Sequence, residues 1–205
     1  MNRLSHLALA GLIALVLSAV LSAQAPSAAK RESEKMQQSL AAIVARSTTP
    51  VPKGKSLAPL RTSFTDKQFN AWLGEGGKDQ LPAGLVGPRV TFDNGGKIAI
   101  RAVVDLDAVR KAKERGWLDP LAYLNGFMEI SMDGTFYGSA GQGTFDVVSA
   151  TLGNVPVPRV FLQELIAYYS KSTDFPNGIL LGKPFPLPAA VRDVSVQRGL
   201  ATVVQ

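Results

Sequence analysis

Apolar residues recur at helical spacing in two short segments of the chain. In the first, residues 65–74, Thr65 and Gln68 have the spacing of a capping box, and Phe64 and Phe69 have that of a hydrophobic staple. The pattern predicts a short amphipathic helix that needs an apolar partner. Its apolar face carries Phe69, Trp72 and Leu73.

A second amphipathic helix is predicted after Pro158, because proline is favourable in the first turn of a helix. From Val160 to Lys171 the polar residues gather on one side, and the opposite side forms an apolar face about 160° wide. That face is made of Phe161, Leu162, Leu165, Ile166, Tyr168 and Tyr169.

Most of the remaining chain alternates between apolar and polar residues, which is typical of strands with one buried face. Residues 89–93 and 97–106 are joined by Asp-Asn-Gly-Gly, a hairpin signal. Residues 125–138 and 142–155 form a second pair, in which the alternation changes parity near Val148 and indicates a β-bulge. Residues 178–187, 191–197 and 200–204 are also strand-like.

Long strands with a bulge and scattered glycines favour a bent sheet. We therefore predict an α+β domain over residues 64–205, in which a long, strongly curved antiparallel sheet is wrapped on two amphipathic helices. The sheet's apolar face needs a partner, and the two helices supply one.

The first 25 residues form an export segment in this interpretation. Arg3 precedes an apolar run from Leu7 to Leu21, and Ala23-Gln24-Ala25 has the pattern of a cleavage site. The segment is either a signal peptide or a retained N-terminal anchor. The protein is expected to be exported, and to be periplasmic or anchored to the inner membrane.

Residues 26–63 are predicted to form a basic stem and a proline-rich linker. Six basic residues lie between Lys30 and Lys55, against two acidic ones. Residues 31–46 could form a helix, but the apolar stripe is narrow and we expect a solvated stem. A basic stem beside an apolar segment suits an anionic membrane surface, and export argues against nucleic acid as a partner.

The residue inventory excludes several kinds of chemistry. The chain has no cysteine, and its one histidine, His6, lies in the leader. The predicted domain therefore lacks thiolate metal sites, cysteine nucleophiles and the imidazole of a Ser-His-Asp triad. No phosphate-loop or dinucleotide-binding motif is present. We expect no enzymatic activity, no cofactor and no metal.

Two groups of carboxylates leave alternatives open. Asp105 and Asp107 supply too few oxygens for calcium, so we expect Asp107 to cap a helix and Asp105 to face solvent. Glu129, Asp133 and Asp146 could instead form an acid pair of the kind that glycoside hydrolases use. A hydrolase of this kind would require Glu129 or Asp146.

The helix that Asp107 opens is predicted to reach Gly116 and to be strongly basic. Cations beside a tryptophan are suited to headgroup phosphates and to the membrane interface, although such a helix can also be simply solvated. The candidate membrane-contact residues are Arg110, Lys111, Lys113, Arg115 and Trp117.

An apolar groove between the two helices and the sheet is the candidate binding site. If the bend of the sheet leaves a cleft, the groove would accept an acyl chain, and if side chains fill it, it is an ordinary core. The candidate ligand-binding residues are Phe69, Trp72, Leu73, Phe161, Leu165, Tyr168 and Tyr169.

The order of several short motifs resembles a known group of proteins. The chain has a leader, then T-x-x-Q-x-N-x-W-L, then V-D-L-D-x-V, V-P-V-P and a closing strand after Leu187-Pro188. This order is similar to the LmeA-like and YceB-like exported lipid-binding proteins of the tubular lipid-binding (TULIP) superfamily. The matching positions are Asn70, Leu73, Asp105 to Val109, Leu187, Pro188, Val194 and Val196.

The resemblance covers residues 64–205 and implies a TULIP-like curved sheet that shelters acyl chains in envelope lipid binding or transfer. The long proline linker and the basic helix after Asp107 depart from it. The sequence thus predicts an exported envelope protein that binds a phospholipid or other acyl ligand and contacts the membrane surface. The alternative is an envelope scaffold with a filled core that binds another protein.

Overall fold

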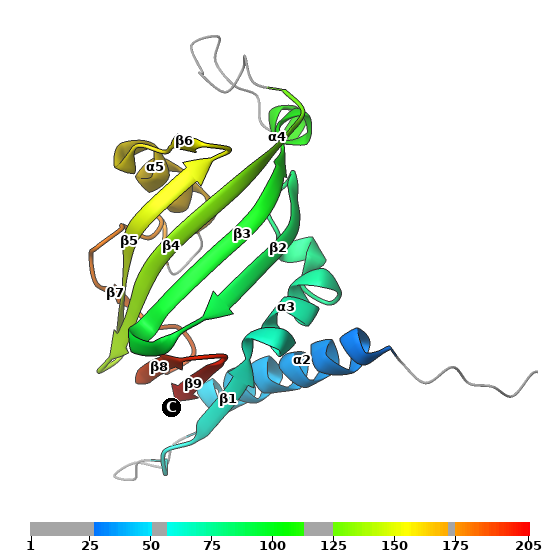
Figure 1. Cartoon of the computed structure of the whole chain (residues 1–205). Coiled ribbons are helices and arrows are strands. Elements are labelled where there is room, and N and C mark those ends of the chain that lie inside the picture. Colours follow the sequence, from blue (N-terminus) through cyan, green and yellow to red (C-terminus); the bar gives the residue numbers. More distant parts are fainter. Residues whose placement is uncertain (1–26, 51–56, 113–124, 172–174) are drawn as a thin grey trace, which may run out of the picture.

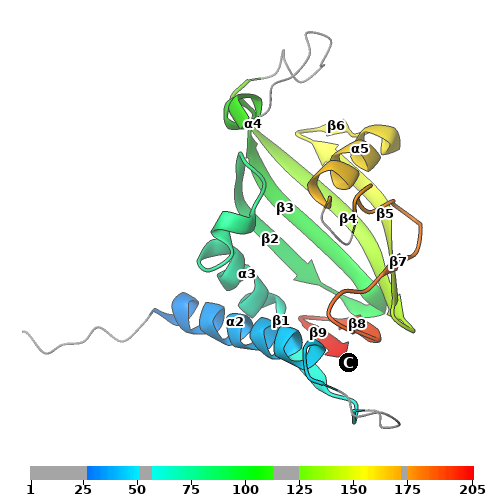
Figure 2. The same cartoon turned by 180° about the vertical axis from the view of Figure 1, so that it is seen from behind.

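The computed structural model describes residues 27–50, 57–112, 125–171 and 175–205. Its central element is an open, curved, antiparallel sheet of nine strands, in the order β1-β9-β8-β4-β3-β2, with β5 pairing with β4, β6 and β7. Figure 1 shows one face of this sheet uncovered, and Figure 2 shows the helices α2, α3 and α5 on the other. The predicted α+β class with a large curved antiparallel sheet is confirmed.

The elements have the following bounds. The strands are β1 (Arg61–Thr65), β2 (Leu85–Phe92), β3 (Lys97–Asp105), β4 (Phe127–Ser139), β5 (Gln142–Leu152), β6 (Val155–Pro156), β7 (Phe185–Pro186), β8 (Asp193–Gln197) and β9 (Leu200–Val204). The α-helices are α2 (Ala28–Ser47), α3 (Asp66–Gly74), α4 (Leu106–Ala112) and α5 (Arg159–Tyr169). Short 3₁₀ turns occur at η1 (Lys78–Gln80) and η2 (Asn94–Gly96).

Helix α3 forms as the sequence predicts. The Thr65 hydroxyl accepts the N–H of Gln68 at 3.1 Å, and the Gln68 side chain accepts the N–H of Thr65 at 2.8 Å, which completes the capping box. The rings of Phe64 and Phe69 stack with their centroids 6.2 Å apart, so the hydrophobic staple is also confirmed.

The segment expected to be a solvated stem is instead a packed helix. Helix α2 begins after Ser27, whose hydroxyl accepts the N–H of Lys30. Met36 is fully buried and Ile43 is 8% exposed. The C-terminal residue holds the far end of α2, because Nε2 of Gln205 donates to the carbonyl of Ile43. The narrow stripe of α2 suffices because α3 and β1 cover it.

The bulge near Val148 is confirmed by the strand register. Asp133 lies opposite Ser149 and Gly134 lies opposite Val147, so Val148 is the extra residue on β5. Its side chain is 76% exposed on the uncovered face. The inward-facing side chains of β5 before the bulge and those after it therefore point to the same face of the sheet.

The predicted strand over residues 178–187 is wrong, because only β7 pairs with the sheet there. Residues 175–184, which we call the strap, form hydrogen bonds with both α5 and β5. The Gln163 side chain accepts the N–H of Leu181 at 2.7 Å and donates to the carbonyl of Ile179 at 3.2 Å. Gly178 has φ +72°, and a Cβ there would clash with the carbonyl oxygen of Ala167.

The cap of α4 differs from the prediction. Asp105, not Asp107, accepts hydrogen bonds from the N–H groups of Asp107 and Ala108, both at 3.0 Å. The Asp107 carboxylate accepts the N–H of Gly126. Residues 113–116 of the predicted helix lie outside the described residues. Within the described residues, none of the helices is both long and apolar enough to span a membrane.

Candidate functional site

A cavity of about 290 Å³ lies between α5 and the helix-covered face of the sheet. The inward-facing side chains of the strands form one continuous patch, because Ala102 lies opposite Ile130, and Ile130 lies opposite Leu152. The next rung toward the centre of the sheet adds Ile100 and Met132. This floor is apolar throughout.

Helix α5 provides the wall that faces this floor. Its lining residues are Val157, just before the helix, and Phe161, Leu162, Leu165 and Ile166. Leu162 is 6% exposed and packs with Ala150 and Leu181. Leu181 belongs to the strap, so the strap and the sheet together fix the helix above the floor.

A third wall comes from two segments outside the two amphipathic helices. Pro82, Ala83 and Leu85 lead into β2, and Leu106 and Val109 belong to the start of α4. Leu106 is 4% exposed. Among the described residues, each one that lines the cavity is apolar, so this part of the wall can exclude water from an apolar group and holds no titratable side chain.

The predicted ligand-binding residues divide between this cavity and a separate core. Phe161 and Leu165 line the cavity. Leu73 is 8% exposed in a cluster with Phe92, and Phe69 and Trp72 pack against that cluster. The ring centroids of Phe69 lie 5.9 Å from Trp72 and 6.0 Å from Phe92. Tyr168 and Tyr169 belong to α5, but their side chains are outside the described part of the structure.

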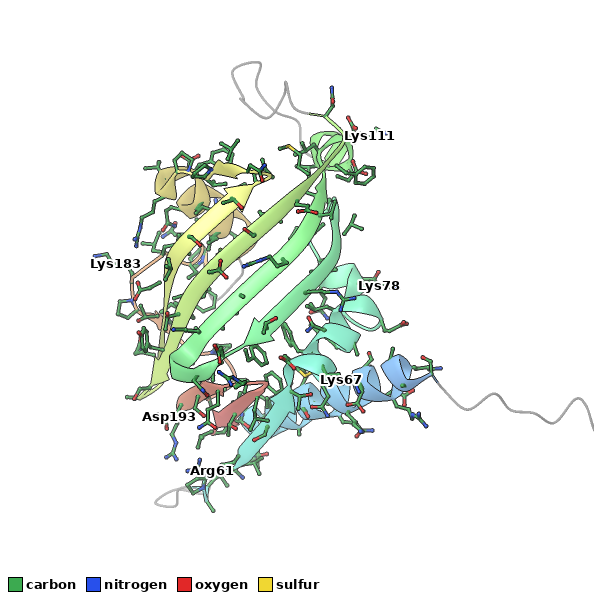
Figure 3. All side chains as sticks on the ribbon, in the orientation of Figure 1. Arg61, Lys67, Lys78, Lys111, Lys183 and Asp193 are labelled. Carbon is green, nitrogen blue, oxygen red and sulfur yellow. The ribbon has the colours of Figure 1, made fainter. Side chains whose placement is uncertain are left out.

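The predicted membrane-contact residues are only partly described. Lys111 is exposed on α4, and Figure 3 places it at the end of the sheet that α4 occupies. Arg110 is on the same helix, but the structure does not describe its side chain. Lys113, Arg115 and Trp117 lie outside the described residues.

The carboxylates of the hydrolase alternative lie on the uncovered side of the sheet or at its border. Asp133 forms a two-pronged ion pair with Arg101 at 2.9 and 3.1 Å, and it also accepts a hydrogen bond from Ser149. Asp146 lies opposite Thr135, and Glu129 lies opposite Val103. None of the three lines the apolar cavity.

Two carboxylates elsewhere have lowered pKa values. The N–H of Asn94 lowers the pKa of Asp93, and Arg198, with its Nε 3.1 Å from the carboxylate, lowers it further. A hydrogen bond from Lys35 lowers the pKa of Glu32. Both groups are partly accessible to solvent, and neither lines the cavity. In the described residues, no three side chains of the types that bind metals gather into a cluster.

Sequence reasoning missed the third wall. Residues 74–87 belonged to none of the predicted helices or strands, and the helix at Asp107 was predicted to contact the membrane or to be solvated, so neither segment entered the site. Leu106 and Val109 are three positions apart, a spacing that places both on one helix face and was a usable signal. The loop residues Pro82 and Ala83 carry no comparable pattern.

The geometry can be compared with what is known of other proteins. Searches with protein-family models, of curated proteins and of solved structures find no match to this chain.

Proposed function

We propose that this protein is an exported, non-enzymatic binder of an acyl ligand, and that the α5 cavity holds the apolar part of that ligand. The observation that carries the proposal is a cavity of about 290 Å³ between a helix and a curved sheet, in which every described lining side chain is apolar. Well-packed interiors contain few voids larger than a water molecule. An apolar cavity of this size lacks packing contacts unless a ligand fills it.

The chemistry of the wall supports an acyl ligand over a polar one. A polar molecule would need hydrogen-bond partners inside the cavity, and the lining residues are proline, alanine, valine, leucine, isoleucine, methionine and phenylalanine. An acyl chain needs none. The volume is near the lower end of the range for ligand pockets, which suits one chain rather than several.

The resemblance to the TULIP superfamily supports the same function, through the motifs of residues 64–205 and the curved antiparallel sheet. The export segment predicted for residues 1–25 and the basic region after it favour an envelope location, where phospholipid acyl chains are available. Binding, with transfer as its extension, is the function we propose.

A scaffold role is the second candidate, and the closely packed α3 end is the observation that favours it. There Phe64, Phe69, Trp72 and Phe92 fill the space between helix and sheet. If the α5 end were filled in the same way in solution, the molecule would have no room for a ligand. It would then act through its surface on an envelope protein.

Native mass spectrometry of the protein purified from producing cells separates the two candidates. We expect a co-purifying lipid mass and, after delipidation, uptake of a fluorescent fatty acid. Leu165→Asp places a charge in the wall and should abolish uptake, whereas Val148→Asp, on the exposed bulge, should not. Circular dichroism of both variants shows whether they are folded. A lipid-free protein that takes up no fatty acid, and crosslinks to one stoichiometric protein in cells, would contradict the proposal.

A further inference from the structure

The end of the sheet next to the cavity carries unusually exposed apolar side chains. Among the described residues, four large apolar side chains are at least 65% exposed: Phe127, Val148, Val155 and Val160. Val148 belongs to the bulge in the middle of β5, and the other three lie at the cavity end. We call Phe127, Val155 and Val160 the rim.

Each rim residue is close in the chain to an element that encloses the cavity. Phe127 begins β4 and lies opposite Asp105, the residue before the lining residue Leu106. Val155 lies opposite the lining residue Leu152 in the β5–β6 pair. Val160 precedes the lining residue Phe161 on α5. The rim therefore borders the segments that line this end of the cavity.

The rim side chains lie on both sides of the sheet's end. Phe127 shares the strand parity of Glu129 and Ser131, which face the uncovered side, whereas Val155 pairs with the inward-facing Leu152. A flat partner laid on one face of the sheet would bury only one of the two. A partner that receives the molecule by its end would bury both.

The charges at this end suit an anionic partner. Lys111 on α4 is an exposed cation at this end, and Figure 3 shows it at the tip. Arg159 begins α5 next to Val160, but its guanidinium lies against Gly182 of the strap, near the Asp146 carboxylate. The nearby carboxylates of Asp105 and Asp107 accept backbone N–H groups of the protein itself. Apolar side chains beside a cation are typical of surfaces that insert into the headgroup region of a bilayer.

We propose that the rim docks the protein, end-on, onto an anionic phospholipid bilayer and sets the cavity against the membrane surface. This inference rests on the proposed function, because an acyl ligand must leave and enter a membrane. A protein partner is the other possible occupant, and the experiment below treats it as a contrary outcome.

The absence of cysteine allows a site-specific test in the full chain. Val155→Cys, Val160→Cys and Val148→Cys are labelled one at a time with an environment-sensitive NBD dye and mixed with vesicles of phosphatidylglycerol and phosphatidylcholine. All three positions are exposed valines, so Val148 is a matched control. We expect a blue shift and brighter emission at positions 155 and 160, and unchanged emission at position 148. The N-terminal segment is common to all three proteins and cannot produce this difference.

Two further arms separate this proposal from the ligand proposal. Lys111→Gln should weaken binding to anionic vesicles about fivefold, and vesicles of phosphatidylcholine alone should lose this dependence. Uptake of a fluorescent fatty acid without vesicles should persist in the labelled proteins. Unshifted rim labels with normal uptake would overturn the membrane inference alone. An equal shift at position 148 would also overturn it, since it would indicate contact through the uncovered face.

Discussion

The two ends of the sheet use the same arrangement, an amphipathic helix against a curved antiparallel surface, but they are filled differently. At the α3 end, the rings of Phe64, Phe69, Trp72 and Phe92 occupy the space, and α2 closes it from outside. At the α5 end, the facing side chains are largely aliphatic and a cavity of about 290 Å³ remains. Side-chain bulk therefore decides which end is core and which end can hold a ligand.

The two ends are also held by the same kind of contact. At the packed end, the Asn70 amide donates to the carbonyl of Val90 and accepts its N–H, both at 2.7 Å, and so covers the edge of β2. At the open end, Gln163 makes the corresponding pair of bonds with the strap at Ile179 and Leu181. The Asn70 contacts fix helix α3 directly to the sheet. The Gln163 contacts fix the strap to helix α5, so at the α5 end this pair of bonds does not restrain the helix against a strand.

Truncation of one leucine in each helix should give the largest difference between the ends. Leu73→Ala opens a void in the packed cluster and should lower the free energy of unfolding by about 2–5 kcal/mol. Leu165→Ala enlarges a space that already exists and should cost only about 1–2 kcal/mol. Urea unfolding followed by circular dichroism measures both. Equal losses would mean that the α5 end is packed as tightly as the α3 end.

Enlarging one alanine at each end tests the same contrast from the opposite direction. Ala201 is 3% exposed in the packed cluster, and Ala201→Leu should destabilise the protein by about 1–3 kcal/mol through overpacking. Ala102 faces the cavity, so the extra volume of Ala102→Leu can be accommodated at a cost of less than about 1 kcal/mol. Thermal and urea unfolding of the pair give the comparison. A large loss for Ala102→Leu would show that the cavity is not available to a side chain.

Removal of the side-chain amide should also destabilise the protein more at the α3 end than at the α5 end, but the difference should be smaller. Asn70→Ala leaves both backbone groups of the 8%-exposed Val90 without these partners and should cost about 1–3 kcal/mol. Gln163→Ala should cost about 0.5–1.5 kcal/mol and act mainly on the strap. Hydrogen exchange is the sharper measurement, because the Leu181 amide should exchange faster in Gln163→Ala while the amides of β3 keep their protection. Faster exchange across β3 would instead indicate global destabilisation.

The smallest expected effect is a pH dependence at the packed end. Arg198 joins the β8–β9 turn to Asp93 of the β2–β3 turn, and the pKa of Asp93 is lowered in the folded protein. A lowered folded pKa stabilises the protein at pH values above the unfolded pKa, which is about 4. That contribution is lost as the pH falls through the folded pKa. The stability difference between the wild type and Asp93→Asn should thus shrink from pH 7 to about pH 3, and a constant difference would contradict the assignment.

Local signals in the sequence predicted the parts of the fold that depend on neighbours along the chain. The capping box of Thr65 and Gln68 specifies α3, and the parity change at Val148 specifies the bulge. Both depend on hydrogen bonds and alternation over a few residues. The inward faces of β3 and β4 were also readable from alternation, because one face of each strand is buried.

Contacts between segments that are far apart in the chain could not be predicted from the sequence. The narrow stripe of α2 indicated a solvated stem, yet Met36 is fully buried because α3 lies against it. The strap over residues 175–184 has the apolar composition of a strand, but Gln163 and Ser170 bind its backbone and replace a neighbouring strand. In the same way, Phe161 and Leu165 were predictable as site residues from the α5 stripe, whereas Pro82 and Ala83 were not.

The most direct test of the ligand site is an equilibrium titration of delipidated protein with a fluorescent fatty acid, comparing the wild type, Ala102→Leu and Ala201→Leu at a temperature where all three are folded. We predict that Ala102→Leu loses binding because its new side chain occupies the cavity, and that Ala201→Leu binds as the wild type does despite its lower stability. Wild-type affinity in a folded Ala102→Leu would contradict the assignment of the α5 cavity as the binding site.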